Sequence, residues 1–241
     1  PNLIDVHVTE ATYYRLFIED FIKEDIGFIT YVDCDVICIN NPIKTIKEHE
    51  EILAKKNLSI SVLEEHGLSE YGFSNFGIES GKYFNAGVMI INLQKWKKDK
   101  LKDNFLEIIE KHSKKLLFWD QDVMNIHFNG NYHRLDPNLN TRVPMEEGSE
   151  LNILTMDQKN KIIFLHYAGK FKPWSIKGIL NINSSFFHKN YELIFNKKYF
   201  ILYIYKINAI KDLLKGIVSL KFMKLKHPIK FLLLSINSIF F

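Results

Sequence analysis

Hydrophobic and polar positions along the chain follow two different periods, and their alternation predicts an α/β fold. Short apolar runs of strand length are separated by longer stretches in which apolar residues recur at helical spacing. The expected strands are residues 28–32, 58–63, 88–93, 132–135 and 162–166. The expected helices are residues 9–22 (which Thr9 would cap), 43–56, 101–112 and 121–128. Strands that alternate with helices are typical of a mostly parallel sheet.

The end of the chain follows a different pattern, both amphipathic and basic. Residues 199–241 contain seven Lys and one Asp, which gives this segment a net charge of +6. The whole chain has a net charge of +4, so residues 1–198 have a net charge of −2. One apolar stripe is expected on a helix there, formed by Ile210, Leu213, Leu214, Ile217 and Val218. We therefore predict a catalytic domain over 1–198 and a basic amphipathic tail over 199–241. Such a tail favours an anionic membrane surface, and packing on the domain is the alternative.

Composition narrows the class of protein. Hydrophobic residues make up 46% and charged residues 25% of the 241 residues, which is typical of a folded globular chain. No apolar run reaches the roughly 18–20 residues that a membrane-spanning helix needs. Cys34 and Cys38 lie four residues apart on one expected strand, too far for a disulfide. They predict reduced, buried thiols in a cytoplasmic protein.

Two carboxylates follow the first expected strand. Asp33 and Asp35 flank Cys34 in an otherwise apolar segment, where unpaired charge costs free energy. A hard divalent cation would lower that cost, because it neutralises two like charges that approach each other. Two solvated turn aspartates are the other interpretation, and this motif alone leaves both open.

Three further segments combine polar residues with strand ends or helix starts. They are YFNAGVMIINLQKW at 83–96, FWDQDVMN at 118–125 and IIFLHYAGKFKPW at 162–174. Each has a structural interpretation: a glycine turn before a core strand, a helix cap, and a histidine that packs. Each also has a chemical one, since His166 can ligate a metal and a lysine beside a glycine turn suits phosphate. Together they indicate a cation site beside a diphosphate.

The ordered motifs YVDCDVIC, YFNAGVMIINLQKW, WDQDVMN and HYAGKFKPW resemble the family 8 glycosyltransferases over about residues 9–175. Within that family the chain looks most like bacterial lipopolysaccharide galactosyl- and glucosyltransferases. The resemblance implies a GT-A nucleotide-binding sandwich that moves galactose or glucose, with retention, from a UDP-sugar to a saccharide or lipid-linked saccharide acceptor. It implies Mn²⁺, or Mg²⁺ in its place, and a role in lipopolysaccharide or other surface glycan synthesis. We expect no nucleic acid partner. The basic tail predicts peripheral binding at the inner, cytoplasmic face of the cell membrane, where a lipid-linked acceptor would be presented.

The resemblance also implies a role for each matching residue. The metal ligands would be Asp33, Asp35 and His166. The donor would further contact Arg15, Cys34, Asn85, Ala86, Gly169 and Lys172. Asp120 would bond the sugar hydroxyls, and Gln121 would lie beside the anomeric carbon, so this pair would be catalytic. A neutral amide is a poor nucleophile, which favours front-face substitution over double displacement through a covalent intermediate.

Two departures from the family pattern stand out. The family's N-terminal strand is absent, so we expect the chain to begin partway through the domain and to bind UDP weakly. The family often has an aspartate at the end of the strand near 58–63, where this chain has Ser61-Val62-Leu63-Glu64. Glu64 or Glu65 would have to replace that sugar contact.

Two other functions fit part of the pattern. A haloacid-dehalogenase-like phosphatase would use Asp33 as nucleophile and Asp120 with Asp122 as its second acidic pair, but it leaves HYAGKFKPW without a role. A non-catalytic sugar- or membrane-binding module on the same fold is the second alternative. The complete set of Asp33, Asp35 and His166 argues against it.

Overall fold

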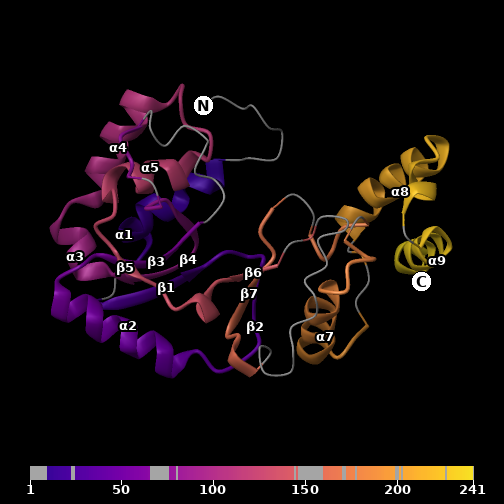
Figure 1. Ribbon diagram of the computed structural model, residues 1–241, viewed down its shortest axis with the longest axis horizontal. Coiled ribbons are helices and arrows are strands. Elements are labelled where there is room, and N and C mark those ends of the chain that lie inside the picture. The colour runs from indigo at the N-terminus through magenta and orange to yellow at the C-terminus, as the bar shows by residue number, and fades with distance from the viewer. Residues whose placement is uncertain are drawn as a thin grey trace. The chain divides into compact units, whose positions relative to one another are not determined.

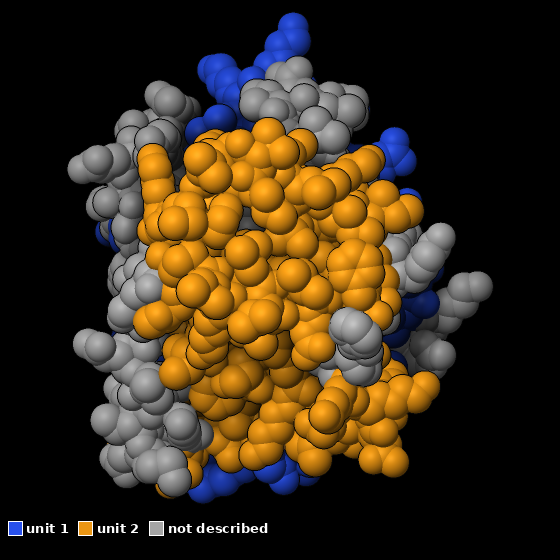
Figure 2. Space-filling model, turned by 90° about the vertical axis from the view of Figure 1, so that its right-hand side faces the viewer, with its two compact units in different colours: residues 1–33, 41–140 blue, residues 34–40, 141–241 orange. Residues whose placement is uncertain are grey.

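The computed structural model consists of two compact units. It describes residues 10–22, 25–65, 76–79, 81–143, 145, 160–169, 172–176, 178–198, 201, 203–225 and 227–240. One unit comprises residues 1–33 and 41–140, and the other comprises 34–40 and 141–241. Figure 2 colours them separately. Each unit is described by itself.

The first unit is built on a four-stranded sheet in the order β1-β4-β3-β5. The strands are β1 (Phe28–Val32), β3 (Ile60–Glu64), β4 (Phe84–Asn92) and β5 (His133–Arg134). β4 is antiparallel to both β1 and β3, and only β3 and β5 are parallel. The expected mostly parallel sheet is therefore wrong for these strands. An antiparallel neighbour needs no helical crossover, and the described residues between β3 and β4 form no α-helix.

Helices flank this sheet on both faces (Figure 1). They are η1 (Glu10–Phe17), α1 (Ile18–Phe21), α2 (Ile43–Lys56), α3 (Leu93–Lys98), α4 (Leu101–His112), α5 (Trp119–Phe128) and the short η3 (Pro137–Leu139). The helices expected at 43–56, 101–112 and 121–128 are confirmed, the first two with the expected bounds. The first expected helix starts as a 3₁₀ helix instead, and Thr9 lies outside the described residues. Leu93 begins α3 and does not end the strand.

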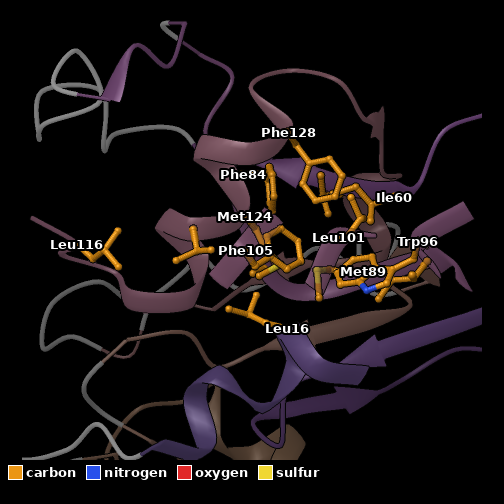
Figure 3. Close-up of a cluster of buried hydrophobic side chains, with 14 residues drawn as sticks. Leu16, Ile60, Phe84, Met89, Trp96, Leu101, Phe105, Leu116, Met124 and Phe128 are labelled. Carbon is orange, nitrogen blue, oxygen red and sulfur yellow. The ribbon is translucent and has the colours of Figure 1, made fainter. Parts of the chain in front are cut away.

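The central strand β4 is buried along nearly its whole length, as a continuous apolar run predicts for a strand covered on both faces. Met89 and Ile91 belong to one buried cluster with Trp96 of α3, Phe105 of α4 and Phe128 of α5. The three aromatic rings pack edge to face or tilted (Figure 3). The core holds β4 and α5 in place, and both carry predicted site residues. Its buried members are Leu16, Ile60, Val62, Phe84, Ala86, Met89, Ile91, Trp96, Leu101, Phe105, Leu116, Val123, Met124 and Phe128.

The second unit contains a three-stranded sheet and the C-terminal helices. Its strands are β2 (Val36–Cys38), β6 (Thr141–Arg142) and β7 (Phe164–His166), in the order β2-β7-β6. β2 is antiparallel and β6 parallel to β7. The helices are α7 (Ser184–Phe195), α8 (Tyr203–Val218), η4 (Lys221–Lys224) and α9 (Pro228–Phe240).

Both cysteines are free, as the sequence predicts, but the prediction that they are buried is wrong. Cys34 lies in the turn between β1 and β2, so its side chain is not covered by a sheet. Cys38 ends β2, which is an edge strand. Both thiols are exposed.

The C-terminal helices pack on residues of their own unit. Leu213 of α8 and Phe231 of α9 belong to one buried cluster with Ile176. The expected apolar stripe of α8 is only partly covered, because Leu214 and Val218 are exposed. The functional division at residue 198 stays a prediction. None of the helices in the described part of the chain is long and apolar enough to span a membrane.

Candidate functional site

The site begins where β1 ends. Asp33 continues the pairing with β4, because its backbone N–H donates to Gly87 O at 2.8 Å. Tyr31, two residues earlier and therefore on the same side of the strand, donates its hydroxyl to Asp33 Oδ1 at 2.8 Å. The carboxylate is thereby held in one orientation at the strand end.

Arg15 of η1 connects four elements of the first unit. Its guanidinium forms ion pairs with Asp33 Oδ1 at 3.0 Å and Asp120 Oδ2 at 2.8 Å. It also donates to the carbonyl oxygen of Ala86 at 2.8 Å and lies over the Tyr31 ring, 4.6 Å from its centre. The planar fork of donors in arginine allows such simultaneous contacts. The arginine expected near the donor thus joins η1, β1, β4 and α5.

Asp120 is buried, with 3% of its surface exposed. Burial raises its pKa to about 7, and the positive charge of Arg15 opposes that rise. Burial lowers the pKa of the Arg15 guanidinium, but Asp120 and Asp33 outweigh that effect and raise it. The two side chains form a buried ion pair at the start of α5.

A cavity of about 160 Å³ lies at these residues. Trp119 forms part of its wall and adopts a positive φ of 48°, which is strained for an aromatic residue. The strain turns the chain into α5 so that the next two side chains reach the cavity. The lining residues are Arg15, Asp33, Ala86, Phe118, Trp119, Asp120 and Gln121.

Gln121 is hydrogen-bonded at both ends of its amide. Its Oε1 accepts from the N–H of Ala86 at 3.0 Å and from Asn85 Nδ2 at 3.4 Å. Its Nε2 donates to the Tyr83 hydroxyl at 3.2 Å and to Glu65 Oε2 at 3.3 Å. The backbone N–H of Ala86 can only donate, so the amide has a single satisfied orientation.

Asn140 is a residue of this network that sequence reasoning missed. It is 1% exposed, and its Nδ2 donates to Asn85 Oδ1 at 3.0 Å. The same oxygen accepts from the N–H of Gly87 at 3.0 Å. Asn140 follows η3, and no local pattern distinguishes it from a loop asparagine.

The two glutamates considered for the sugar contact take different partners. Glu64 pairs with Arg134 at 3.1 Å, whereas Glu65 accepts the hydrogen bond from Gln121. Glu65 is therefore the glutamate that faces the predicted catalytic amide.

The second unit holds the other predicted ligands. In the β2–β7 register Val36 is opposite His166, which places the imidazole beside Asp35. Asp35 Oδ1 lies 3.4 Å from His166 Nε2, and its Oδ2 pairs with the ammonium of Lys172. Lys172 also donates to the carbonyl oxygen of Tyr167 at 2.9 Å. Burial raises the pKa of Asp35, but His166 and Lys172 together outweigh it and lower the value to about 2.

The donor chemistry of this cluster fits a divalent cation. Asp35 is 9% and His166 3% exposed, and the two buried ligand atoms face each other at more than normal hydrogen-bond length. A carboxylate oxygen and a neutral imidazole are ligands that Mn²⁺ accepts. Asp35 and His166 are two of the three metal ligands that the sequence predicts, and the third, Asp33, belongs to the first unit.

The loop after β7 has a tight backbone. Gly169 has φ +99°, a conformation that favours glycine. The N–H and hydroxyl of Ser175 both donate to the Lys172 carbonyl oxygen, at 2.9 and 2.7 Å. A Cβ on Gly178 would lie only 2.2 Å from that oxygen. The position of Lys172 therefore depends on a glycine at 178.

The fold is GT-A-like, and the comparisons identify the family of glycosyltransferases to which the chain belongs. The chain belongs to glycosyl transferase family 8, a family of retaining nucleotide-sugar hexosyltransferases, because the family's model matches residues 5–178. The predicted family and the GT-A-like fold are thereby confirmed. The crystal structure of the galactosyltransferase LgtC, in complex with donor and acceptor sugar analogues, superposes with a TM-score of 0.61 at 23% identity, covering 76% of this chain and 66% of that one.

Curated relatives support the same family. General stress protein A of Bacillus subtilis (strain 168) is 28% identical over 191 residues, 76% of this chain and 65% of the relative. A lipopolysaccharide 1,2-glucosyltransferase of Escherichia coli is 27% identical over 170 residues, 68% of this chain and 49% of the relative. The chain thus spans about half to two thirds of the length of these relatives.

Proposed function

We propose that this chain transfers a hexose, galactose or glucose, from a UDP-sugar to a saccharide or lipid-linked saccharide acceptor with retention of configuration, in lipopolysaccharide or other surface glycan synthesis. One observation carries the proposal. Arg15 binds Asp33 and Asp120 at once, which links the acidic turn after β1 to the cavity where α5 begins. A sugar diphosphate needs both a cation site and a polar sugar pocket.

The residues expected to bind the donor have suitable chemistry. Asp33, Asp35 and His166 would hold Mn²⁺ or Mg²⁺, which when bound would stabilise negative charge on the departing diphosphate. The ammonium of Lys172 already pairs with a carboxylate, and a diphosphate would offer it a stronger anionic partner. Gly169 would let the diphosphate approach the backbone closely.

The sugar would bind in the cavity of the first unit. Asp120 would accept hydrogen bonds from sugar hydroxyls, since it lines the cavity beside its ion-pair partner Arg15. Asn85, Ala86 and Cys34 would complete the donor site. Glu65 is the better candidate for the missing family aspartate, because it bonds to Gln121.

The state of Gln121 supports a front-face route. Both ends of its amide are engaged and it carries no charge, so it is a poor nucleophile. In the front-face route the bond between the anomeric carbon and the phosphate oxygen breaks while the acceptor oxygen bonds to that carbon. The acceptor's proton passes to the leaving phosphate. Gln121 would then steady the backbone beside the anomeric carbon.

The proposal is tested by hydrolysis of UDP-galactose and UDP-glucose with and without Mn²⁺. Asp35→Asn should lower the affinity for Mn²⁺ by at least about tenfold, because it removes a negatively charged candidate ligand. Asp20→Asn, at an exposed carboxylate that pairs with Lys102, is the matched control. Cleavage of neither sugar nucleotide, or an unchanged Mn²⁺ requirement in Asp35→Asn, would contradict the proposal.

We also propose a location at the inner face of the cell membrane, with residues 199–241 against anionic lipid. Two features support it: exposed apolar side chains on α8, such as Leu214 and Val218, and the lysines Lys211 and Lys215 on the same helix. Binding would be peripheral, and it would bring the site close to a lipid-linked acceptor.

A further inference from the structure

Asp122 makes a set of hydrogen bonds that the predicted chemistry does not use. Its side chain is 3% exposed, and Oδ2 accepts from the N–H groups of Leu117 and Phe118 at 2.6 and 2.8 Å. Oδ1 accepts from the Tyr83 hydroxyl at 2.6 Å. The carboxylate reaches back over the start of its own helix, as the acidic residue of a capping box does. It does not line the cavity.

Tyr83 connects this carboxylate to the predicted catalytic amide. Its hydroxyl donates to Asp122 and accepts from Gln121 Nε2 at 3.2 Å. Burial raises the pKa of the Tyr83 phenol, and the carboxylate of Asp122 raises it further, so the hydroxyl stays protonated. One oxygen atom thus joins two successive residues of α5 to the segment that leads into β4.

A second pair of contacts holds the same helix to the same strand. Asn125, one turn after Asp122, accepts from the N–H of Phe84 at 2.7 Å and donates to its carbonyl oxygen at 3.0 Å. Its amide also donates to the carbonyl oxygen of Gln121 at 2.9 Å. The start of α5 is therefore fixed on β4 through side chains three residues apart, which lie on one helix face.

Trp119, the residue with the strained backbone, lies between the backbone groups that Asp122 binds and the predicted catalytic residues Asp120 and Gln121. Trp119, with its positive φ, directly follows the two N–H groups that Asp122 holds and precedes Asp120. A non-glycine residue keeps such a conformation only where its surroundings impose it. The bonds to Leu117 and Phe118 supply that constraint.

We propose that Asp122 and Tyr83 are a positioning pair, which keeps the 117–119 turn strained and so aims Asp120 and Gln121 at the donor sugar. They act on the reaction through those two residues and do not touch the substrate. The inference rests on the proposed function where it concerns turnover. Its structural part, the constraint on the turn, stands without it.

The first experiment requires no activity. Hydrogen exchange of the 117–122 segment is compared in the wild type, Tyr83→Phe and Tyr132→Phe. Tyr132 is the matched control, since its hydroxyl is also a hydrogen-bond donor but donates to the carbonyl oxygen of Lys82, at 2.8 Å, and not to Asp122. Exchange should be about fivefold to tenfold faster in Tyr83→Phe, as the loss of one hydrogen bond implies. Equal exchange in all three proteins would overturn the inference.

The second experiment separates positioning from binding. With Mn²⁺ and the UDP-sugar that the wild type hydrolyses, Tyr83→Phe should lower kcat about tenfold and change KM less than about twofold, because misplaced catalytic groups affect the transition state more than the ground state. Tyr132→Phe should match the wild type. An unchanged kcat in Tyr83→Phe would overturn the positioning role and leave the transferase proposal intact. A wild type without turnover would overturn the transferase proposal, and the exchange rates would then decide the inference.

Two variants of Asp122 provide an independent test, in which asparagine is the conservative replacement and alanine the disruptive one. Asp122→Asn keeps one carbonyl oxygen for the N–H groups of Leu117 and Phe118, whereas Asp122→Ala keeps none. Protection of 117–122 from exchange should therefore decrease in the order wild type, Asp122→Asn, Asp122→Ala, and kcat should decrease in the same order. If Asn and Ala behave identically while both proteins remain folded, the hydrogen bonds of Asp122 do not position the turn. This comparison also decides the question if Tyr83→Phe fails to fold.

Discussion

At the scale of single residues, Gly178 occupies a position that has no room for a side chain. A Cβ there would lie 2.2 Å from the Lys172 carbonyl oxygen, a backbone atom that cannot move away cheaply. Gly178→Ala should destabilise the protein by about 1–3 kcal/mol, as overpacking does, and weaken UDP binding. Gly216→Ala is the control: nothing lies within 4 Å of its added Cβ, and alanine in α8 should stabilise by about 0.5–1 kcal/mol. Thermal melting and UDP titration measure both, and opposite signs are expected.

The ammonium of Lys172 pairs with the carboxylate of Asp35, where it would compete with a metal cation. Lys172→Met should therefore strengthen binding of Mn²⁺ alone by about tenfold, because the charge-assisted bond that competes for the carboxylate is lost. The same variant should weaken binding of Mn²⁺ together with UDP, since the diphosphate loses a cation. Electron paramagnetic resonance of free Mn²⁺ reads out both, with the exposed Lys189→Met as control. Weaker binding of Mn²⁺ alone to Lys172→Met would contradict this role.

The sequence motifs predicted many residues of the candidate site, but not the hydrogen bonds and ion pairs that join them. Arg15, Asp33 and Asp120 were expected from the motifs, and the structure brings them together. That one guanidinium would join them was not evident, because the three positions are far apart in the sequence. Asn140 lies outside the motifs, and Tyr83 opens one of them without a predicted role, because the roles of both arise from contacts with residues distant in the sequence.

At the scale of elements, a buried histidine links α2 to the sheet. His49 Nε2 accepts from the N–H of Asp136 at 3.1 Å, so its hydrogen is on Nδ1, which donates to Ser61 Oγ at 2.8 Å. Protonation would break the first of these bonds. Burial lowers the pKa of His49 below 6.5, and the nearby His133 lowers it further, while Asp136 opposes the shift.

The lowered pKa of His49 determines how stability depends on pH. Below pH 6.5 the unfolded chain binds the proton more tightly than the folded one, so stability is lost as pH falls through this value toward the lower folded pKa. His49→Gln should flatten the dependence of Tm on pH between about 5 and 7. It should also lower the free energy of unfolding by about 1–3 kcal/mol, and hence Tm, at every pH, because a buried hydrogen bond is lost. The exposed His227→Gln is the control. An unchanged slope in His49→Gln would show that His49 does not contribute.

Element type was predictable where apolar periodicity was long, as in α2 and α4. Strand direction was not. Alternating strands and helices suggested parallel neighbours, yet β4 pairs antiparallel with both β1 and β3. The pattern of one strand specifies which faces are buried, and the pairing partner depends on how the chain returns to the sheet. The exposure of Cys38 likewise depends on β2 being an edge strand.

At the scale of the whole molecule, the C-terminal helices decide how membrane binding should be tested. Deletion of 199–241 would uncover Ile176, which packs with Leu213 and Phe231. Charge reversal is the cleaner test. Lys211→Glu with Lys215→Glu should weaken binding to vesicles with anionic lipid by about 30-fold or more, since each lysine near such a surface contributes about 1 kcal/mol. Added salt should weaken the wild type as well.

The control for that prediction is a reversal of equal charge elsewhere. Lys111→Glu with Lys114→Glu, at exposed positions at the end of α4 and just after it, should leave vesicle binding nearly unchanged. Equal loss in both double variants would indicate a general charge effect. No binding by the wild type would remove the proposed membrane location.

The exposed thiol of Cys34 has a practical consequence. It lies between Asp33 and Asp35, whereas the thiol of Cys38 donates to the carbonyl oxygen of Asn40 at 3.1 Å. The protein therefore carries its own attachment point for a fluorophore or spin label beside two candidate metal ligands. With Cys38→Ser, occupancy of the cation site becomes visible by spectroscopy without an engineered cysteine.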